Sequence, residues 1–155
     1  MKLSIAVILS MLSFACKDTR PIRQIELSKF KCDKSAKELS DQPVAISGYL
    51  VPPVVIFCKS GKCSVNLQLT EEQLEPSVTI DLVPGSGPNT MDMPPENFRK
   101  TDFAFRDAAG KGHRSNEQVV VTGIFDFTDA YETIPNGCRI RQVREIRPEG
   151  QFLAK

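Results

Sequence analysis

Residues 42–69, QPVAISGYLVPPVVIFCKSGKCSVNLQL, constrain the fold of this chain more than any other stretch. The first part alternates along its length as a strand does, and Pro52-Pro53 ends it because proline cannot donate a hydrogen bond to a central ladder. The remainder predicts a hairpin around a Ser60-Gly61 turn, with Cys58 opposite Cys63. The register is specific, since a slip of one residue would exchange the two faces of the hairpin.

This register sorts the hairpin into an apolar face and a mixed face, because successive side chains of a strand point in opposite directions. The apolar face, which we expect to pack on the core, comprises Val54, Ile56, Cys58, Cys63, Val65, Leu67 and Leu69. The mixed face comprises Val55, Phe57, Lys59, Lys62, Ser64, Asn66 and Gln68.

A chain of 155 residues is long enough for one domain with a real core but hardly for two. Its 9 glycines and 11 prolines suit many short strands joined by turns. Alternating apolar residues predict strands at 44–51, 78–82, 103–105, 119–127 and 138–146. Short helical turns are expected at 70–73 and 96–100, and residues 84–95 are expected to be irregular.

Two of these strands are alike. Residues 44–50 and 119–125 are both β-branched runs with a central glycine, Gly48 or Gly123, preceded by a hydroxyl residue. A glycine within a strand commonly marks a bulge or a sharp bend, as a small barrel needs. The order of elements from Val44 to Pro148 resembles the OB-fold, which implies a mostly β protein built as a small barrel with short helical turns. A β-sandwich is the alternative, because short strands separated by turns suit it equally.

The N-terminus predicts export. Lys2 precedes an apolar run over 3–12 that is too short to span a bilayer, which takes ~20 residues, and small residues follow before Cys16. The segment resembles a bacterial lipoprotein signal peptide, which implies that Cys16 becomes the lipidated first residue. It departs from that pattern because Leu12 lies one position further from the cysteine than usual and Phe14 is bulky. An ordinary signal peptide is the alternative.

The resulting domain organisation is a signal peptide over residues 1–15, a lipid-anchored tether over 16–24 and a single β domain over 25–155. The resemblance implies a protein held on a membrane of the bacterial cell envelope, either on the periplasmic side of the outer membrane or at the cell surface. Its expected partners are the membrane, reached through the lipid, and an envelope protein or glycan.

The cysteines other than Cys16 are even in number, as in a disulfide framework of an exported protein. Opposed positions in the hairpin put the Cα atoms of Cys58 and Cys63 ~4.5 Å apart, at the short end of the disulfide range. A bond between Cys32 and Cys138 then follows by elimination. A zinc site would want a closer cysteine pair, and a thioredoxin-type dithiol has two intervening residues at a helix start rather than four on a hairpin.

No catalytic signature stands out. The one histidine of the chain, His113, lies in a polar segment with two glycines and is expected to be a solvated loop residue. The Gly85-Ser86-Gly87 segment lacks the lysine and helix start of a phosphate loop. We therefore expect no enzyme, no cofactor and no metal site. A net charge of +1 supplies no general attraction to nucleic acid, which makes that partner unlikely.

A candidate binding face remains, formed by Tyr49, Phe57, Asn66, Arg139 and Arg141. As alternate residues of one strand, the two arginines should point the same way, and guanidinium groups suit phosphate, carboxylate or sulfate. The alternative is that the arginines protect an edge strand while Tyr49 and Phe57 are partly buried. We expect a non-catalytic binding or structural role in the envelope. The alternative function is a thiol–disulfide redox protein that uses Cys58 and Cys63.

Overall fold

The structure, a computed structural model, describes residues 18–72, 76–131, 135 and 137–150. The predicted signal peptide and the lipid attachment at Cys16 lie outside these residues, as does part of the helical turn expected at 70–73. The elements in chain order are β1 (Arg23–Ile25), η1 (Leu27–Lys29), η2 (Lys34–Leu39), β2 (Pro43–Val51), β3 (Cys58–Lys59), β4 (Lys62–Gln68), β5 (Ser77–Pro84), β6 (Thr90–Met91), η3 (Lys100–Asp102), β7 (Ala104–Arg106), β8 (Gly112–Arg114), β9 (Gln118–Thr128) and β10 (Gly137–Pro148).

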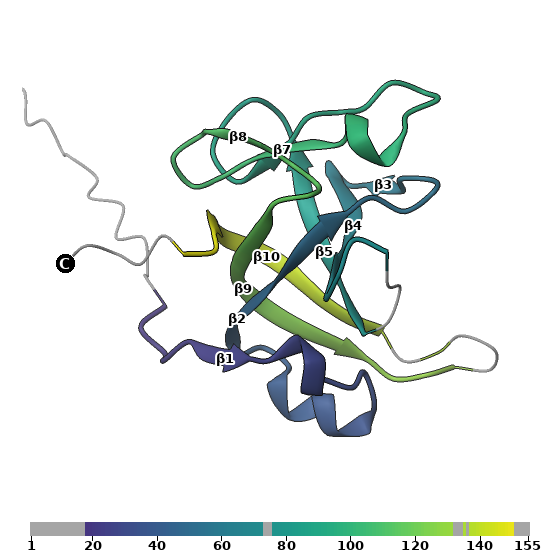
Figure 1. Ribbon diagram of the computed structural model, residues 1–155. Helices are drawn as coiled ribbons and strands as arrows, with labels where there is room; N and C mark the ends of the chain where they lie inside the picture. The colour runs from purple at the N-terminus through teal and green to yellow at the C-terminus, as the bar shows by residue number, and fades with distance from the viewer. Residues whose placement is uncertain (1–17, 73–75, 132–134, 136, 151–155) are drawn as a thin grey trace, which may run out of the picture.

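Five of these strands close into a barrel (Figure 1). β2 pairs with β4, β4 with β5, β5 in parallel with β10, β10 with β9, and β9 again with β2. The order and the single parallel pair are those of an OB-like barrel, so the predicted fold is confirmed. A sandwich is excluded because the ladder returns to its first strand. The inward residues of the strands form the core, among them Ile46, Leu67, Ile80, Val121 and Ile140.

The N-terminal segment lies on the outside of this barrel and does not hang free. The carboxylate of Asp18 accepts a hydrogen bond from Arg144 of β10 at 2.7 Å, and Arg20 donates to the carbonyl of Asp41 just before β2. Residues 18 and 20 are thus tied both to β10 and to Asp41 just before the start of β2. The tether predicted over residues 16–24 is therefore too long. Residues 18 and 20 are held against the barrel, and residues 23 and 24 belong to β1, which pairs in parallel with β2.

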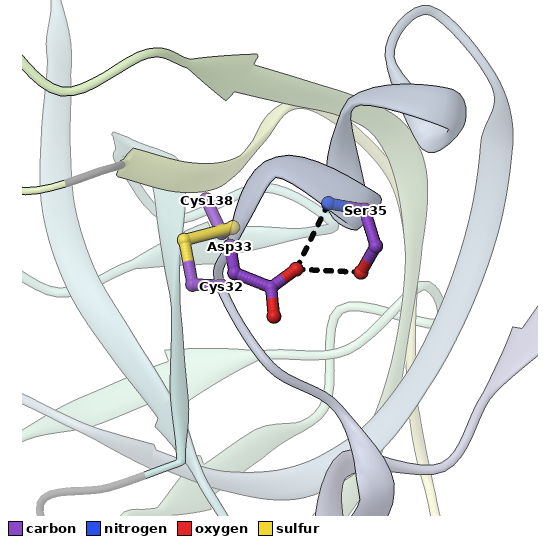
Figure 2. Close-up of a disulfide and its surroundings, with 4 residues drawn as sticks. All are labelled: Cys32, Asp33, Ser35 and Cys138. Atoms are coloured by element: carbon purple, nitrogen blue, oxygen red, sulfur yellow. Dashed lines mark hydrogen bonds between the residues drawn. A yellow bond between two sulfur atoms is a disulfide. The ribbon is translucent and has the colours of Figure 1, made fainter.

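A disulfide fastens the next segment to the far end of the chain (Figure 2). Cys32 is bonded to Cys138 at the start of β10, and the Asp33 carboxylate accepts hydrogen bonds from the backbone N–H and the hydroxyl of Ser35. The second bond joins Cys58 to Cys63. Both pairings are those expected from the sequence, and two disulfides are compatible with an exported protein.

The hairpin prediction is correct at its turn and wrong beyond it. Cys58 pairs with Cys63 and Lys59 with Lys62, as the Ser60-Gly61 turn requires. Val54 and Ile56, however, do not continue the strand toward Leu67. β4 is hydrogen-bonded to β2 along one edge and to β5 along the other, so almost no edge is left for residues 54–57.

Residues 84–115 form a small sheet of β6, β7 and β8 at the end of β5. The strand expected at 103–105 is β7, while the helix expected at 96–100 is instead the single turn η3. The side chain of Asn89 ties this insert to β10: its amide donates to the carbonyl of Arg144 at 3.1 Å, and its oxygen accepts from the N–H of Ile146 at 2.7 Å. The insert is thus part of the same domain as the barrel.

Candidate binding surfaces

The predicted binding face is only partly assembled. Asn66 and Arg139 share the outer surface of the barrel, because Asn66 is paired with Thr79 of β5 and Thr79 with Arg139. Tyr49 lies further along the same surface, on β2, where it is half-buried. Phe57 stands in the loop before β3, beyond the end of that surface. The sheet therefore gathers three of the five residues.

Arg139 and Arg141 do not point the same way, contrary to the prediction. The Arg139 guanidinium reaches Asp81 on β5 at 3.4 Å, whereas Arg141 pairs with Asp41, which is hydrogen-bonded to β9. A register shift between Ile140 and Gln142 separates them. β10 is also no edge strand, since it is paired on both sides. Each guanidinium has a carboxylate partner and is not poised for an external anion.

The loop between β2 and β3 exposes an unusual amount of apolar surface. Val54 is 94% exposed and Phe57 75%, and Val55 and Met93 are also exposed; we call these four residues the loop patch. Val54, Val55 and Met93 line a hollow of about 210 Å³, together with Ile56, Pro94, Pro95 and Phe98. Single exposed apolar residues are ordinary, but a contiguous group of them marks an interaction surface.

Covalent and local contacts hold this loop in place. The Cys58–Cys63 disulfide closes its end, and the N–H of Ser64 donates to the carbonyl of Phe57 at 2.9 Å. The sulfur of Cys63 lies 3.8 Å from that of Met93, so the loop and the insert meet at the disulfide. The apolar side chains are thus presented from a braced support. Sequence reasoning placed Val54 in the core and so missed most of the patch.

His113 is not a solvated loop residue; the expectation was wrong. It lies in β8, is 3% exposed and stacks on Phe105 with a ring separation of 5.6 Å. Its Nε2 is 2.9 Å from the carboxylate of buried Asp107, and its Nδ1 is 2.7 Å from that of Glu117. The other Asp107 oxygen accepts from the N–H groups of Ala109 and Lys111. The cluster therefore ties the β7–β8 hairpin together.

This arrangement favours the charged form of all three groups. Burial of the imidazole opposes protonation most strongly, but the hydrogen bonds to Glu117 and Asp107 together outweigh it and raise the pKa of His113. The pKa of Glu117 is lowered, chiefly by its hydrogen bond to His113. Burial acts against ionisation of Asp107 too, yet hydrogen bonds from His113, Lys111 and Ala109 lower its pKa. Both ring nitrogens of His113 are engaged by carboxylates.

A pH dependence follows from these directions. Because the pKa of His113 is raised above its ordinary 6.5, its contribution is complete below pH 6.5 and is lost as the pH rises through the folded value. The carboxylates contribute above their ordinary 3.8 and 4.5, and their contribution is lost on acidification. We expect the protection factors of the β7 and β8 amides, which are the intrinsic exchange rates at each pH divided by the observed rates, to be highest between pH 4.5 and 6.5.

The matched variant is His113→Gln, which keeps a hydrogen-bonding side chain but cannot titrate. In this variant the β7 and β8 amides should be less protected from exchange at every pH, and their protection should no longer fall as the pH rises above 6.5. Because His113 is the only histidine of the chain, an NMR titration of its ring gives the folded pKa directly. A midpoint below 6.5 would contradict the proposed balance of burial and hydrogen bonding.

Among the described residues, no helix has the length and hydropathy that crossing a bilayer requires. In the same part of the chain, no group of three or more His, Cys, Asp or Glu side chains is arranged to hold a metal ion.

Comparisons with known proteins add little. No protein family matches the sequence, and no curated protein matches it. One matching solved structure is a provisionally assigned aspartyl-tRNA synthetase from Leishmania major Friedlin, at 13% identity and a TM-score of 0.43. The match covers 89% of this chain and 22% of that one. A likeness at this level supports no statement about function.

Proposed function

We propose that this protein is a lipid-anchored lipoprotein of the bacterial cell envelope that binds a protein partner through the loop patch and has no catalytic activity. The observation that carries the proposal is the exposure of Val54, Val55 and Phe57 on a braced loop, together with Met93 of the adjoining insert. An apolar surface of Val, Phe and Met side chains suits a protein partner better than a glycan, which would favour the more polar surface around Tyr49 and Asn66.

The position of the N-terminus supports an arrangement in which the lipid anchor and the loop patch lie on opposite sides of the protein. Asp18 is held against Arg144 and lies two positions after Cys16, so the backbone of Cys16 is at most ~7 Å from that of Asp18. In Figure 1 the described N-terminus and β3, with the loop beside it, lie on opposite sides of the barrel. A lipid on Cys16 would therefore hold one side near the bilayer and turn the loop patch away from it.

Two measurements test the proposal. The mass of the mature protein from its host envelope should show lipid on Cys16; an unmodified N-terminus elsewhere would refute the anchor. With a photo-crosslinker at position 54 in intact envelopes, the double variant Val55→Ser/Phe57→Ser should reduce adducts at least ~tenfold, as interface hot spots do. Tyr131→Ser is the matched control, because Tyr131 is equally exposed on another loop. Adducts that survive the double variant would exclude the patch.

The redox alternative also has one observation in its favour. Cys58 is exposed whereas Cys63 is fully buried, so an external thiolate could reach one sulfur of the hairpin disulfide. A redox protein should reduce this bond reversibly in a mild glutathione buffer without unfolding. If it opens only together with global unfolding, the bond braces the loop and the redox function is excluded.

A further inference from the structure

A second surface, on the side of the barrel that carries the N-terminus, has the features of a small-molecule site. Ser47 of β2, Val120 of β9 and Arg147 of β10 are direct partners in neighbouring strands, so they form a row on the outer surface. With Gln24 of β1 and Pro148 they line a pocket of about 380 Å³. That volume is within the usual range for ligand pockets, ~300–1,000 Å³.

Arg147 differs from the other arginines of β10. Arg139, Arg141 and Arg144 each have a carboxylate partner. Within the described part of the chain, the guanidinium of Arg147 makes no ion pair. Its Nε is shielded from solvent without a hydrogen-bond partner, as is the Nε of Arg141, but Arg141 also has Asp41 on a terminal nitrogen and Arg147 has no such contact. A shielded N–H left without an acceptor is costly, and a ligand oxygen in the pocket would satisfy it.

Charge in the pocket is not of one sign. Glu149 also lines it, two residues after Arg147, and no ion pair joins the two. A simple anion would be attracted by the guanidinium and repelled by the carboxylate. A zwitterion avoids this conflict if its anionic group meets Arg147 and its cationic group meets Glu149. Val120 and Pro148 add apolar side chains to the lining.

The location indicates where such a zwitterion would come from. Arg147 is three residues beyond Arg144, which holds Asp18, so it is ~10 Å along the strand from the exit of the chain toward Cys16. We propose that the pocket binds the headgroup of a phosphoethanolamine lipid, with the phosphate on Arg147 and the ammonium on Glu149. This inference rests on the proposed membrane anchor, which would bring the pocket close to such headgroups.

The test uses soluble probes and the full chain as isolated from the envelope. Binding of glycerophosphoethanolamine, measured by calorimetry, should weaken at least ~tenfold in Arg147→Gln, because charge-assisted hydrogen bonds are lost. Glu149→Gln should weaken this probe as well while leaving glycerophosphoglycerol, which has no ammonium, unchanged or tighter. Arg23→Gln is the charge-matched control, since Arg23 lies on β1 outside the pocket.

Three results would overturn the proposal: no binding of glycerophosphoethanolamine, unchanged binding in Arg147→Gln, or inorganic phosphate binding as tightly as the zwitterion.

Vesicles distinguish the lipid from a free metabolite. Phosphatidylethanolamine should protect the Arg147 N–H from exchange, and phosphatidylcholine, whose quaternary ammonium has no hydrogen to donate, should not. A lipid on Cys16 with no probe binding refutes the pocket alone. Probe binding to a chain without lipid refutes the anchor and the membrane source.

Discussion

Replacing Cys32 and Cys138 together by alanine is expected to lower the free energy of unfolding by about 4–5 kcal/mol. The bond spans 106 residues, so its loss restores a large conformational entropy to the unfolded chain. It is also the covalent link between the segment before β2 and the start of β10 (Figure 2). Denaturant unfolding of the double variant measures the effect, and replacing both residues avoids a reactive free thiol.

The matched control is Cys58→Ala/Cys63→Ala. That bond closes a loop of only 5 residues, so the same entropic reasoning gives about 2 kcal/mol. The ratio between the two variants tests the mechanism more sharply than either value. Equal losses would show that native-state contacts, and not the size of the closed loop, determine what each bond contributes.

Gly123→Ala is expected to cost about 3 kcal/mol, although alanine is ordinarily the better residue within a strand. A Cβ at this position would overlap the carbonyl oxygen of Gln142 and the side chain of Ile140 on β10. At Gly48, the other member of the repeated strand pattern, a Cβ would lie 2.6 Å from the carbonyl oxygen of Gln68. Neighbouring backbone cannot move aside without breaking the ladder, so thermal unfolding should begin at markedly lower temperature.

Gly87→Ala is the control for this substitution. No atom lies within 4 Å of a Cβ built there, and its backbone is not in the left-handed region, so the change should stay within ~0.5 kcal/mol. If Gly123→Ala were equally mild, β9 and β10 would have to be further apart than the structure places them. The outcome therefore also tests the closure of the barrel.

Much of the architecture was predictable because it rests on local patterns. Alternation placed β2, β5, β9 and β10 within a few residues of their bounds. The repeated glycines were expected to mark bulges or bends, and what the structure shows at both is a close approach of the neighbouring backbone. The opposed positions of Cys58 and Cys63 then left Cys32 and Cys138 to each other, as observed.

The candidate sites were harder to predict because they depend on which strands compete for an edge. Val54 has the apolar character of a core residue, yet β4 already has two neighbours, so Val54 is left exposed. Nothing near His113 in the sequence suggests burial. Its partners Asp107 and Glu117 are charged residues of a glycine-containing segment, and only the pairing of β7 with β8 brings them onto the ring.

The arginines of β10 show the same division between local and long-range information. Their spacing correctly indicated a strand, because strand periodicity is a property of successive residues. Whether each guanidinium is free depends on residues far away in the sequence: Asp81 and Asp41 neutralise Arg139 and Arg141, while Arg147 has no such partner among the described residues. Strand order and register bring these distant residues together. The sequence pattern was therefore sufficient to predict the strands of the barrel, but only the closed barrel determines which of its surface groups are paired and which are free.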